Sequence, residues 1–551
     1  MNFLLNLNHK SPNLWVIKLN VLKKNILVYL FFITAILPLS AQMSYKEMMY
    51  DNSINFYDVS YAAESYFATI DKEAKGSGWK PYQRWKIANE YKYYPSGDRS
   101  QIDPEFTIHA YEAFLKNNPQ NKALFPFGWN ELGPLSIDSL TGHYSAGFGR
   151  VEDVYVDPNN ANTVYLGSRS GGFWRSFDGA ATWDGSTTDF LLATGVNTFD
   201  VLPTNTNVIL ANIRNSNNGY SHGLYQSFDA GATWTQTNFN PTNLGVGGLG
   251  SSFRVFEVAY HPTVPNLIFI GTSRGIYRSD DNLTTWTRLI TTGDITAIDF
   301  HPTDPSIIYL LDTYSPNSTR DYVYKSTNQG LSYSLSNQII SNNNGSGRLS
   351  TSPVCPECLY FASDNGVWKS IDAGVNFSFL SNPGASCGGF CVSDLDTTNM
   401  IYGYVDIERT TNSGQNFEQV TWWSLGNTAH GTGSFDEKFL NSTQYVHADL
   451  RIAKSVGGVF YVGTDGMFAK SIDNGATWED LSQGLGIREN YKLGASQSNH
   501  YKTISGSQDN GTSIKIQDGW IEFYGADGME GLIHPLNDNW LIGSVQYGSR
   551  R

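Results

Sequence analysis

From about residue 129 onward, the order of apolar and polar residues predicts short β-strands joined by turns. A run of alternating apolar and polar residues ends at a turn such as 301–305, and a second short apolar run, 307–311, follows it. A third run ends in an eight-residue string whose last residue is aromatic and opens a fourth run. Because this order returns along the chain, we expect one unit of four strands to be repeated.

The eight-residue string marks each repeat and suits a hairpin turn. An Asp at its third position can accept hydrogen bonds from the amides of the turn, and a Gly at its fifth position tolerates a positive φ. The closing aromatic side chain can pack back over the hairpin. Ala180 and Leu283 replace the Gly, while Asn328 and Asn412 replace the Asp and can still make the turn hydrogen bonds. The seven strings are SFDGAATW (176–183), SFDAGATW (227–234), SDDNLTTW (279–286), STNQGLSY (326–333), SIDAGVNF (370–377), TTNSGQNF (410–417) and SIDNGATW (471–478).

The third positions of successive strings lie 40 to 61 residues apart, which fits four strands with their turns. We therefore predict an all-β fold over residues 129–551, a β-propeller of four-stranded blades with seven marked repeats and eight or more in total. Beyond the last string, residues 491–516 supply three strands and residues 529–547 open another unit. Two interpretations stay open: the chain is a fragment, or a strand at residues 129–132 completes the ring and leaves no exposed sheet edge.

Residues 1–41 have the pattern of a cleavable signal peptide. Lys23 and Lys24 precede an apolar run, 26–39, and small residues lead to Ala41. The alternative is a membrane anchor, but the run is shorter than the roughly 20 residues that cross a bilayer. We expect the mature protein to begin near Gln42, to be secreted or exposed at the cell surface, and to contain no membrane span.

Residues 42–128 predict a helical, aromatic-rich segment ahead of the strands. Asp103 is a suitable N-cap and Pro104 a suitable first residue for a helix that stops near residue 117. An aromatic cluster before it suits either a sugar-stacking platform or anchors that dock the segment onto the propeller, and we favour the anchors. The cluster consists of Trp79, Tyr82 and Trp85.

The composition agrees with β-structure and excludes some partners. Aromatic residues make up 14% of the chain and charged residues 16%, with a formal net charge of −14 and no basic stripe. Such a surface repels the phosphates of nucleic acids and anionic lipids, so neither is expected as a partner.

Four cysteines lie close together in the sequence, as CPEC and CGGFC. In an exported protein, this even number predicts two disulfides that tie neighbouring blades together. A four-thiolate zinc site is the alternative, and we favour the disulfides because a zinc site needs thiols kept reduced. The four residues are Cys355, Cys358, Cys387 and Cys391.

The marker strings are similar to the Asp-box of bacterial sialidases, sortilin-type propellers and xyloglucan-cleaving two-propeller glycoside hydrolases. The chain most resembles secreted Asp-box (BNR repeat) propellers of the Bacteroidetes with a sortilin N-terminal domain signature. The residues that carry this likeness are Gly149-Arg150-Val151, Gly463-Thr464-Asp465-Gly466 and the string 506–511. The resemblance implies export by type IX secretion, and the sorting domain common in that group is not visible here, which favours the fragment interpretation.

Acidic residues near strand ends are the candidates for catalysis, because glycoside hydrolysis needs two carboxylates across a cleft. The catalytic motifs of the hydrolase relatives are not found, and most of these carboxylates are also typical of turns. His447 and Asp449 would share one face of a strand, as a base with its orienting partner, as two metal ligands or as a satisfied polar pair, and we favour the polar pair because two residues are too few for a zinc site. The carboxylate candidates are Asp449, Asp465, Asp509, Asp527 and Glu530; the ligand-binding candidates are Arg150, Arg169, His447 and Trp423.

Two functions follow from these observations. We favour a secreted binding or scaffold module for a polysaccharide or an extracellular protein, without a metal or cofactor, which would not hydrolyse polysaccharides. The alternative is a xyloglucanase-like glycoside hydrolase that uses loop carboxylates, and clustering of the four aspartates in a cleft with exposed tryptophans would favour it. A sialidase is disfavoured because residues 253–256 match its opening motif at only two positions.

Overall fold

The computed structural model describes residues 44–74, 76–100, 106–117, 131–141, 147–246, 252–313, 320–340, 347–424, 434–517 and 519–551. The predicted signal peptide lies outside these residues, as do Asp103, Pro104 and Trp129. The chain divides into two compact units, Met1–Phe106 and Thr107–Arg551. The predicted domain boundaries at residues 41 and 128 stay predictions.

The first unit is helical, and its aromatic residues form its own core. Tyr82 is fully buried and stacks on Phe67, while Trp85 stacks on Phe56 with ring centroids 5.2 Å apart. The aromatic cluster therefore serves packing among these helices, and docking onto the propeller is not needed to explain it. The helices are α2 (Tyr45–Tyr50), α3 (Phe56–Phe67) and α4 (Trp79–Tyr93), and α5 (Phe106–Asn117) follows at the unit boundary. No helix in the described ranges is long and apolar enough to cross a membrane.

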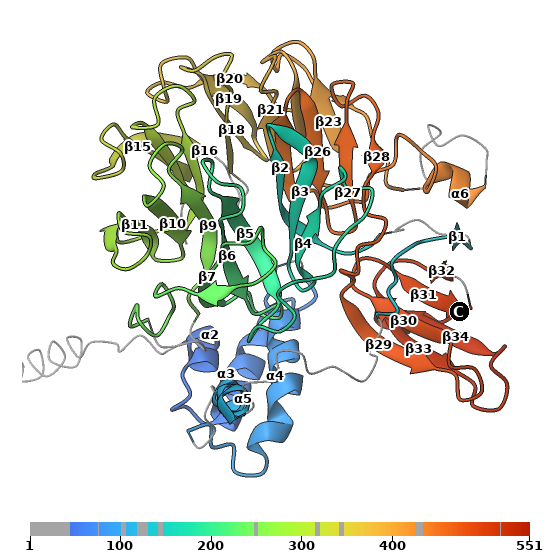
Figure 1. The fold of residues 1–551 in the computed structure, drawn as a ribbon. Helices are drawn as coiled ribbons and strands as arrows, with labels where there is room; N and C mark the ends of the chain where they lie inside the picture. Colours follow the sequence, from blue (N-terminus) through green and yellow to red (C-terminus); the bar gives the residue numbers. More distant parts are fainter. Residues whose placement is uncertain are drawn as a thin grey trace, which may run out of the picture. The chain divides into compact units, whose positions relative to one another are not determined.

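The second unit consists of antiparallel sheets in chain order (Figure 1). Consecutive strands pair within each sheet, as four-stranded repeats require. The first four sheets are β2 (Val151–Asp157), β3 (Asn160–Ser168), β4 (Gly172–Ser176); β5 (Gly195–Val201), β6 (Ile209–Arg214), β7 (Ser221–Ser227), β8 (Thr235–Gln236); β9 (Val255–Tyr260), β10 (Ile268–Thr272), β11 (Gly275–Ser279), β12 (Thr287–Ile290); and β13 (Ile295–Phe300), β14 (Ile308–Asp312), β15 (Arg320–Ser326), β16 (Ser334–Ile340). The next three are β17 (Arg348–Thr351), β18 (Leu359–Ser363), β19 (Gly366–Ser370), β20 (Ser378–Ser381); β21 (Gly389–Val392), β22 (Met400–Gly403), β23 (Ile407–Thr410), β24 (Glu418–Gln419); and β25 (Ile452–Val456), β26 (Val459–Gly463), β27 (Phe468–Ser471), β28 (Glu479–Asp480).

The first strands of these seven sheets contact one another in a closed ring, from β2 through β5, β9, β13, β17 and β21 to β25, which returns to β2. Carboxylates on the first strands join neighbours: Asp153 Oδ2 accepts from Phe199 N (3.1 Å) and Asp200 Oδ2 from Tyr260 N (2.7 Å). Lys454 of β25 closes the ring, because its Nζ donates to Asp153 Oδ1 at 2.9 Å. This arrangement is that of a β-propeller.

The remaining strands lie outside the ring. One sheet contains β29 (Asn490–Ala495), β30 (Thr503–Ser507), β31 (Thr512–Ile516) and β32 (Gly519–Tyr524), with β1 (Ser139–Leu140) parallel to β32. The strands β33 (Gly528–Ile533) and β34 (Leu541–Val545) form another, and a short helix α6 (Phe435–Lys438) precedes β25. The ring closes through β2 and β25, so closure by residues 129–132 is not needed; Glu131 and Leu132 belong to no strand.

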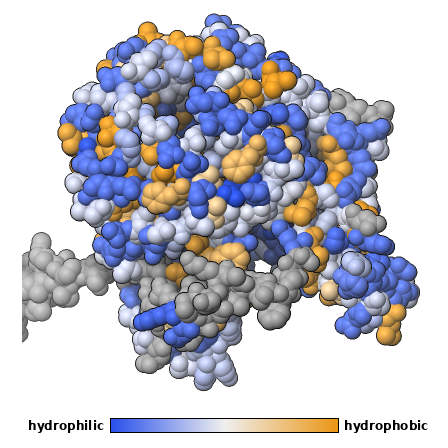
Figure 2. All heavy atoms as spheres, viewed as in Figure 1, coloured by the Kyte–Doolittle hydropathy of each residue, from blue (hydrophilic) through white to orange (hydrophobic). Residues whose placement is uncertain are grey.

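On the face in Figure 2, apolar residues form small separate groups among hydrophilic ones.

The seven marker strings form turns that leave the third strand of a sheet, as predicted. In the string 471–478, Asp473 Oδ1 accepts from Ser471 Oγ (2.8 Å) and Thr477 N (2.9 Å). The fifth residue has a positive φ even where it is not glycine, 69° at Ala180 and 64° at Leu283. Of the closing aromatics only Trp478 is fully buried, and the others are half-buried.

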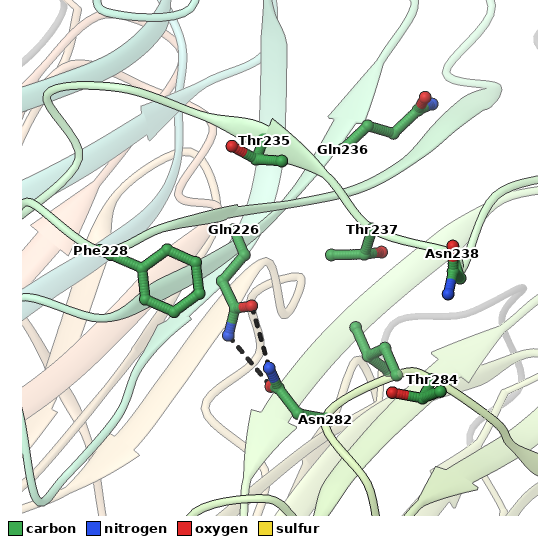
Figure 3. A pocket seen from close by; sticks show the side chains of 9 residues that line it. Gln226, Phe228, Thr235, Gln236, Thr237, Asn238, Asn282 and Thr284 are labelled. Carbon is green, nitrogen blue, oxygen red and sulfur yellow. Dashed lines mark hydrogen bonds between the residues drawn. The ribbon is translucent and has the colours of Figure 1, made fainter.

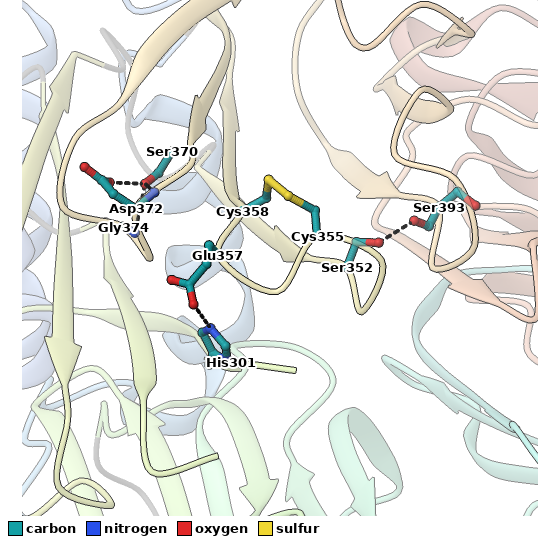
Figure 4. The surroundings of a disulfide bond; sticks show 9 residues. All are labelled: His301, Ser352, Cys355, Glu357, Cys358, Ser370, Asp372, Gly374 and Ser393. Atoms are coloured by element: carbon teal, nitrogen blue, oxygen red, sulfur yellow. Dashed lines mark hydrogen bonds and ion pairs between the residues drawn. A yellow bond between two sulfur atoms is a disulfide. The ribbon is translucent and has the colours of Figure 1, made fainter. Parts of the chain in front are cut away.

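The prediction of two disulfides between blades is wrong. A single disulfide joins Cys355 to Cys358 within the turn between β17 and β18 (Figure 4), and Cys387 and Cys391 are buried free thiols. Cys391 points to the opposite side of β21 from its neighbours Phe390 and Val392, which pack with Cys358. The alternation of side chains along a strand therefore keeps Cys391 away from the other cysteines.

Candidate functional site

Three charged residues meet at one end of the β25–β28 sheet. Asp449 and Arg451 lead into β25, and Asp465 follows β26. These strands are antiparallel neighbours with Ile452 opposite Gly463, so the beginning of one lies beside the end of the other.

Asp465 is buried between two arginines. Arg451 Nε donates to its Oδ1 at 2.6 Å, and a second nitrogen of the same guanidinium donates to Oδ2. Arg150 Nε lies 3.4 Å from Oδ1. Burial alone would lower the pKa of Arg451, but its hydrogen bonds to Asp465 raise that pKa above its usual value. The two hydrogen bonds between the Arg451 guanidinium and the Asp465 carboxylate fix both side chains at this end of the sheet.

Asp449 has a strained backbone and an accessible carboxylate. Its φ is +65°, which L-residues rarely adopt. Its side chain is 30% exposed, with Arg451 3.7 Å from Oδ2, and it shares a hydrogen bond with Tyr404. Burial, followed by the charge of Asp465, raises the pKa of Asp449.

Asp509 and Asp527 come from the neighbouring β29–β32 sheet and the turn after it. Asp509 also has a positive φ, +56°, and its N donates to Asp527 Oδ1 at 2.9 Å. Burial raises the pKa of Asp509 to about 7, and the charges of Asp465 and Asp527 contribute to the same shift. This carboxyl group therefore keeps its proton to a higher pH than an ordinary aspartate does.

The structure thus brings Asp449, Asp465, Asp509 and Asp527 into electrostatic contact, but Glu530 stays apart. Asp465 raises the pKa of both Asp449 and Asp509. Glu530 is exposed on β33, and its backbone N donates to Ser544 Oγ at 3.0 Å.

His447 supports this site without pairing with Asp449. Its ring is 4% exposed, with Nδ1 3.1 Å from Ala448 O and Nε2 3.1 Å from Asp509 O. Burial lowers its pKa, although both carbonyls oppose that shift. A Cβ at Gly466 would lie 2.4 Å from the ring, so the histidine fits tightly and fixes the backbone of Asp509.

The other ligand-binding candidates differ in position. Arg150 belongs to the site through Asp465, and Arg169 donates from Nε to Ser216 O at 3.2 Å. Trp423 is half-buried, packs against the core of the β21–β28 region, and its N donates to Asp406 Oδ1 at 2.8 Å.

The sequence interpretation missed Arg451, Tyr404 and Glu152. Arg451 lies two residues beyond Asp449, and Glu152 two residues beyond Arg150, a spacing that places side chains on one face of an extended segment. That spacing was the available signal. Tyr404 comes from the β22–β23 turn, and only the tertiary fold brings it to Asp449.

A shallow pocket lies elsewhere, between the β5–β8 and β9–β12 sheets (Figure 3). The side-chain amides of Gln226 and Asn282 hydrogen-bond reciprocally in it, each at 3.1 Å. Among the described residues, no carboxylate or histidine lines it, and these offer no groups for acid–base chemistry there.

Comparisons with known proteins identify relatives of this fold. No protein-family model matches the chain. A xyloglucanase of Hypocrea jecorina is 26% identical over 243 residues, which are 40% of this chain and 27% of that protein. The crystal structure of a GH74 xyloglucanase from Xanthomonas campestris superposes with a TM-score of 0.52 at 14% identity, over 74% of this chain and 65% of that one. An ancestral GH74 enzyme gives 0.51 at 16% identity, over 74% and 60%.

The chain therefore has a propeller-like fold similar to that of these enzymes, and spans less than two thirds of the length of each. The same comparisons overturn the expectation of a non-catalytic binding or scaffold module, because the relative found by sequence is a glycan-cleaving enzyme. The expectation that the chain leaves polysaccharides intact loses its basis with it.

Proposed function

We propose that this protein is a glycoside hydrolase acting on a polysaccharide of the xyloglucan class, with its active site at the four aspartates. The observation that carries the proposal is their convergence from two sheets around Asp509, whose pKa burial raises to about 7. A glycosidase needs one carboxyl group that keeps its proton near neutral pH and a second that is ionised. The sequence relationship to a xyloglucanase supports the substrate class.

Asp509 is the general acid in this proposal. Its protonated form donates to the glycosidic oxygen as the bond to the leaving sugar breaks. The nearby carboxylates of Asp465 and Asp527 make loss of this proton costly, which keeps it available. His447 holds the Asp509 carbonyl and limits movement of the loop.

Asp449 is the partner carboxylate. It is more accessible than Asp465, whose oxygens are occupied by Arg451 and Arg150. A half-exposed carboxylate can remove a proton from water that attacks the sugar. Tyr404 and Arg451 hold its orientation.

The proposal also covers three predictions from the sequence. These are the export signal, membership of the Asp-box family and the number of blades. The closed ring of first strands supports a seven-bladed propeller over β2–β28. We propose that β29–β34 belong to a second propeller and that the protein acts outside the cell, where its polysaccharide substrates occur.

The test is release of reducing ends from xyloglucan by the wild-type protein and by Asp509→Asn and Asp449→Asn variants. We expect each variant to lose activity by at least about a hundredfold, since general acid–base groups contribute about 10²–10⁴. The matched control is Asp184→Asn, an exposed aspartate paired with Arg175 at an outer strand. Equal activity of all four proteins would contradict the proposed site.

A further inference from the structure

Four arginines converge on one edge of the propeller beside Asp465. Arg150 directly precedes β2, Arg169 follows β3, Arg214 ends β6 and Arg254 directly precedes β9. The first strand of each sheet begins at this edge, and the second strand ends there. The arginines of three consecutive sheets, those that begin with β2, β5 and β9, therefore lie at the same edge. The clustering is notable because the whole chain has a net charge of −14.

The cluster has fewer acidic neighbours than positive charges: Glu152, Asp465, and Asp294, which interacts electrostatically with Arg254. Arg150 Nε lies 2.9 Å from Glu152 Oε1, and the Arg214 guanidinium lies 3.6 Å from that same oxygen. The second carboxylate near Arg150, Asp465, is already bonded to Arg451.

Arg214 is buried close to the other three positive charges. Its side chain is 14% exposed, and its buried Nε has no hydrogen-bond acceptor among the described residues. Burial lowers its pKa to about 10, and the charges of Arg169, Arg150 and Arg254 act in the same direction. An unpaired buried donor of this kind is costly to stability.

Support of the β6–β7 loop explains only part of the cluster. Arg169 Nε donates to Ser216 O at 3.2 Å, and one nitrogen of Arg254 donates to Asn218 O at 3.3 Å. Each guanidinium has five N–H donors, so these contacts leave most of them unused. Arg254 is exposed and Arg169 is half-exposed, which keeps the remaining donors accessible from solvent.

We propose that Arg150, Arg169, Arg214 and Arg254 form a binding site for an oxyanion carried by a glycan, foremost the carboxylate of a uronic acid residue. The planar guanidinium matches a carboxylate in two parallel hydrogen bonds. The negative surface elsewhere repels polyanionic chains and so confines them to this edge. The inference rests on the proposed function only in taking the ligand to be a glycan, and it adds acidic sugars to the substrate class.

The test is calorimetric titration of the full chain with polygalacturonate, a sulfated galactan and neutral xyloglucan at low and high salt. Arg254→Gln and Arg169→Gln are the variants of choice, because these side chains are the more exposed ones and circular dichroism will verify their folding. Arg409→Gln is the matched control, an arginine paired with Glu418 between β23 and β24. We expect each site variant to bind the acidic glycan at least about tenfold more weakly, with neutral glycan binding unchanged.

Added salt should weaken acidic-glycan binding by the wild-type protein and by the control alike. Tighter binding of the sulfated galactan than of polygalacturonate would support the oxyanion site and identify sulfate as its source. Absence of acidic-glycan binding, or binding that both site variants retain, would overturn the inference. Xyloglucan hydrolysis by the wild-type protein separates this inference from the hydrolase proposal: acidic-glycan binding that the site variants lose, in a protein that releases no reducing ends from xyloglucan, would support the inference and contradict the hydrolase proposal alone.

Discussion

The third residue of each marker turn accepts hydrogen bonds from within its own turn. Asp473 accepts from Ser471 Oγ, from Thr477 N and from Thr477 Oγ1, the last at 2.7 Å. Asn328 accepts from Ser326 Oγ and Ser332 N in the same way, at 2.9 and 3.1 Å. The charge of the carboxylate is therefore not essential to the turn, although its acceptor oxygens are.

Replacing Asp473 by Ala should lower the free energy of unfolding by about 1 kcal/mol, because the amide and hydroxyl donors of the turn lose their acceptor. Asp473→Asn should retain most of the stability, as the natural asparagines in equivalent turns indicate. Urea unfolding followed by tryptophan fluorescence measures both variants. Equal destabilisation by Ala and Asn would show that charge, rather than hydrogen bonding, holds the turn.

At the scale of strands and turns, locally determined features were predictable and side-chain pairing across sheets was not. The marker turns follow from hydrogen bonds within eight residues, so the sequence pattern was sufficient to place them. The cysteine pairing depends on which side of β21 each side chain occupies, and the CGGFC spacing does not reveal where β21 begins. Cys387 precedes the strand at Gly389, whereas Cys391 lies within it and faces the opposite core.

The free cysteines supply a prediction at this scale. Burial raises the pKa of Cys387 to about 12 and also raises that of Cys391, so neither thiol should react with a maleimide in the native protein at pH 7. Mass spectrometry should find no adduct before unfolding and two after unfolding without reductant. Four adducts after unfolding would mean that Cys355 and Cys358 are not bonded, and none would mean that all four cysteines are oxidised.

At the scale of the whole molecule, an ion pair connects the β29–β32 sheet to the beginning of the ring. Arg488 lies 3.1 Å from Glu522 Oε2, with their side chains 1% and 0% exposed, and its Nε donates to Gly147 O at 3.0 Å. Burial raises the pKa of Glu522, and Arg488 opposes that shift. This buried pair therefore links the sheet that carries Asp509 to the segment just before β2.

Removing one member of this pair should destabilise the protein strongly. Arg488→Met leaves the Glu522 carboxylate buried without its partner and should cost about 3 kcal/mol. The double variant Arg488→Met/Glu522→Gln should recover part of that loss, while Lys470→Met, which breaks an exposed pair with Glu479, should cost less than about 1 kcal/mol. Thermal unfolding compares the three. Equal effects of Arg488→Met and Lys470→Met would contradict the role of the buried pair.

The sequence predicted the repeating architecture at this scale and named the four aspartates, but it assigned the wrong function. Each aspartate has a turn context that accounts for its presence, so nothing local distinguished Asp509 from an ordinary turn residue. Its raised pKa arises from burial that only the folded chain creates, and then from the charge of Asp465, which lies 44 positions earlier in the sequence. The sequence therefore could not show that the four aspartates lie close together in the folded chain, and this was the information needed to recognise a candidate active site.

The dependence of kcat/KM on pH for xyloglucan hydrolysis tests the central claim most directly. The general acid must be protonated, so activity should be full below the pKa of Asp509, about 7, and fall tenfold per pH unit above it. On the acid side, activity should fall as Asp449 gains a proton, at a pH above the usual range of an aspartate because its pKa is raised. A bell-shaped profile whose alkaline limb lies near pH 7, together with loss of activity in Asp509→Asn, is the predicted result. No measurable hydrolysis, or an alkaline limb that persists unchanged in Asp509→Asn, would contradict the account.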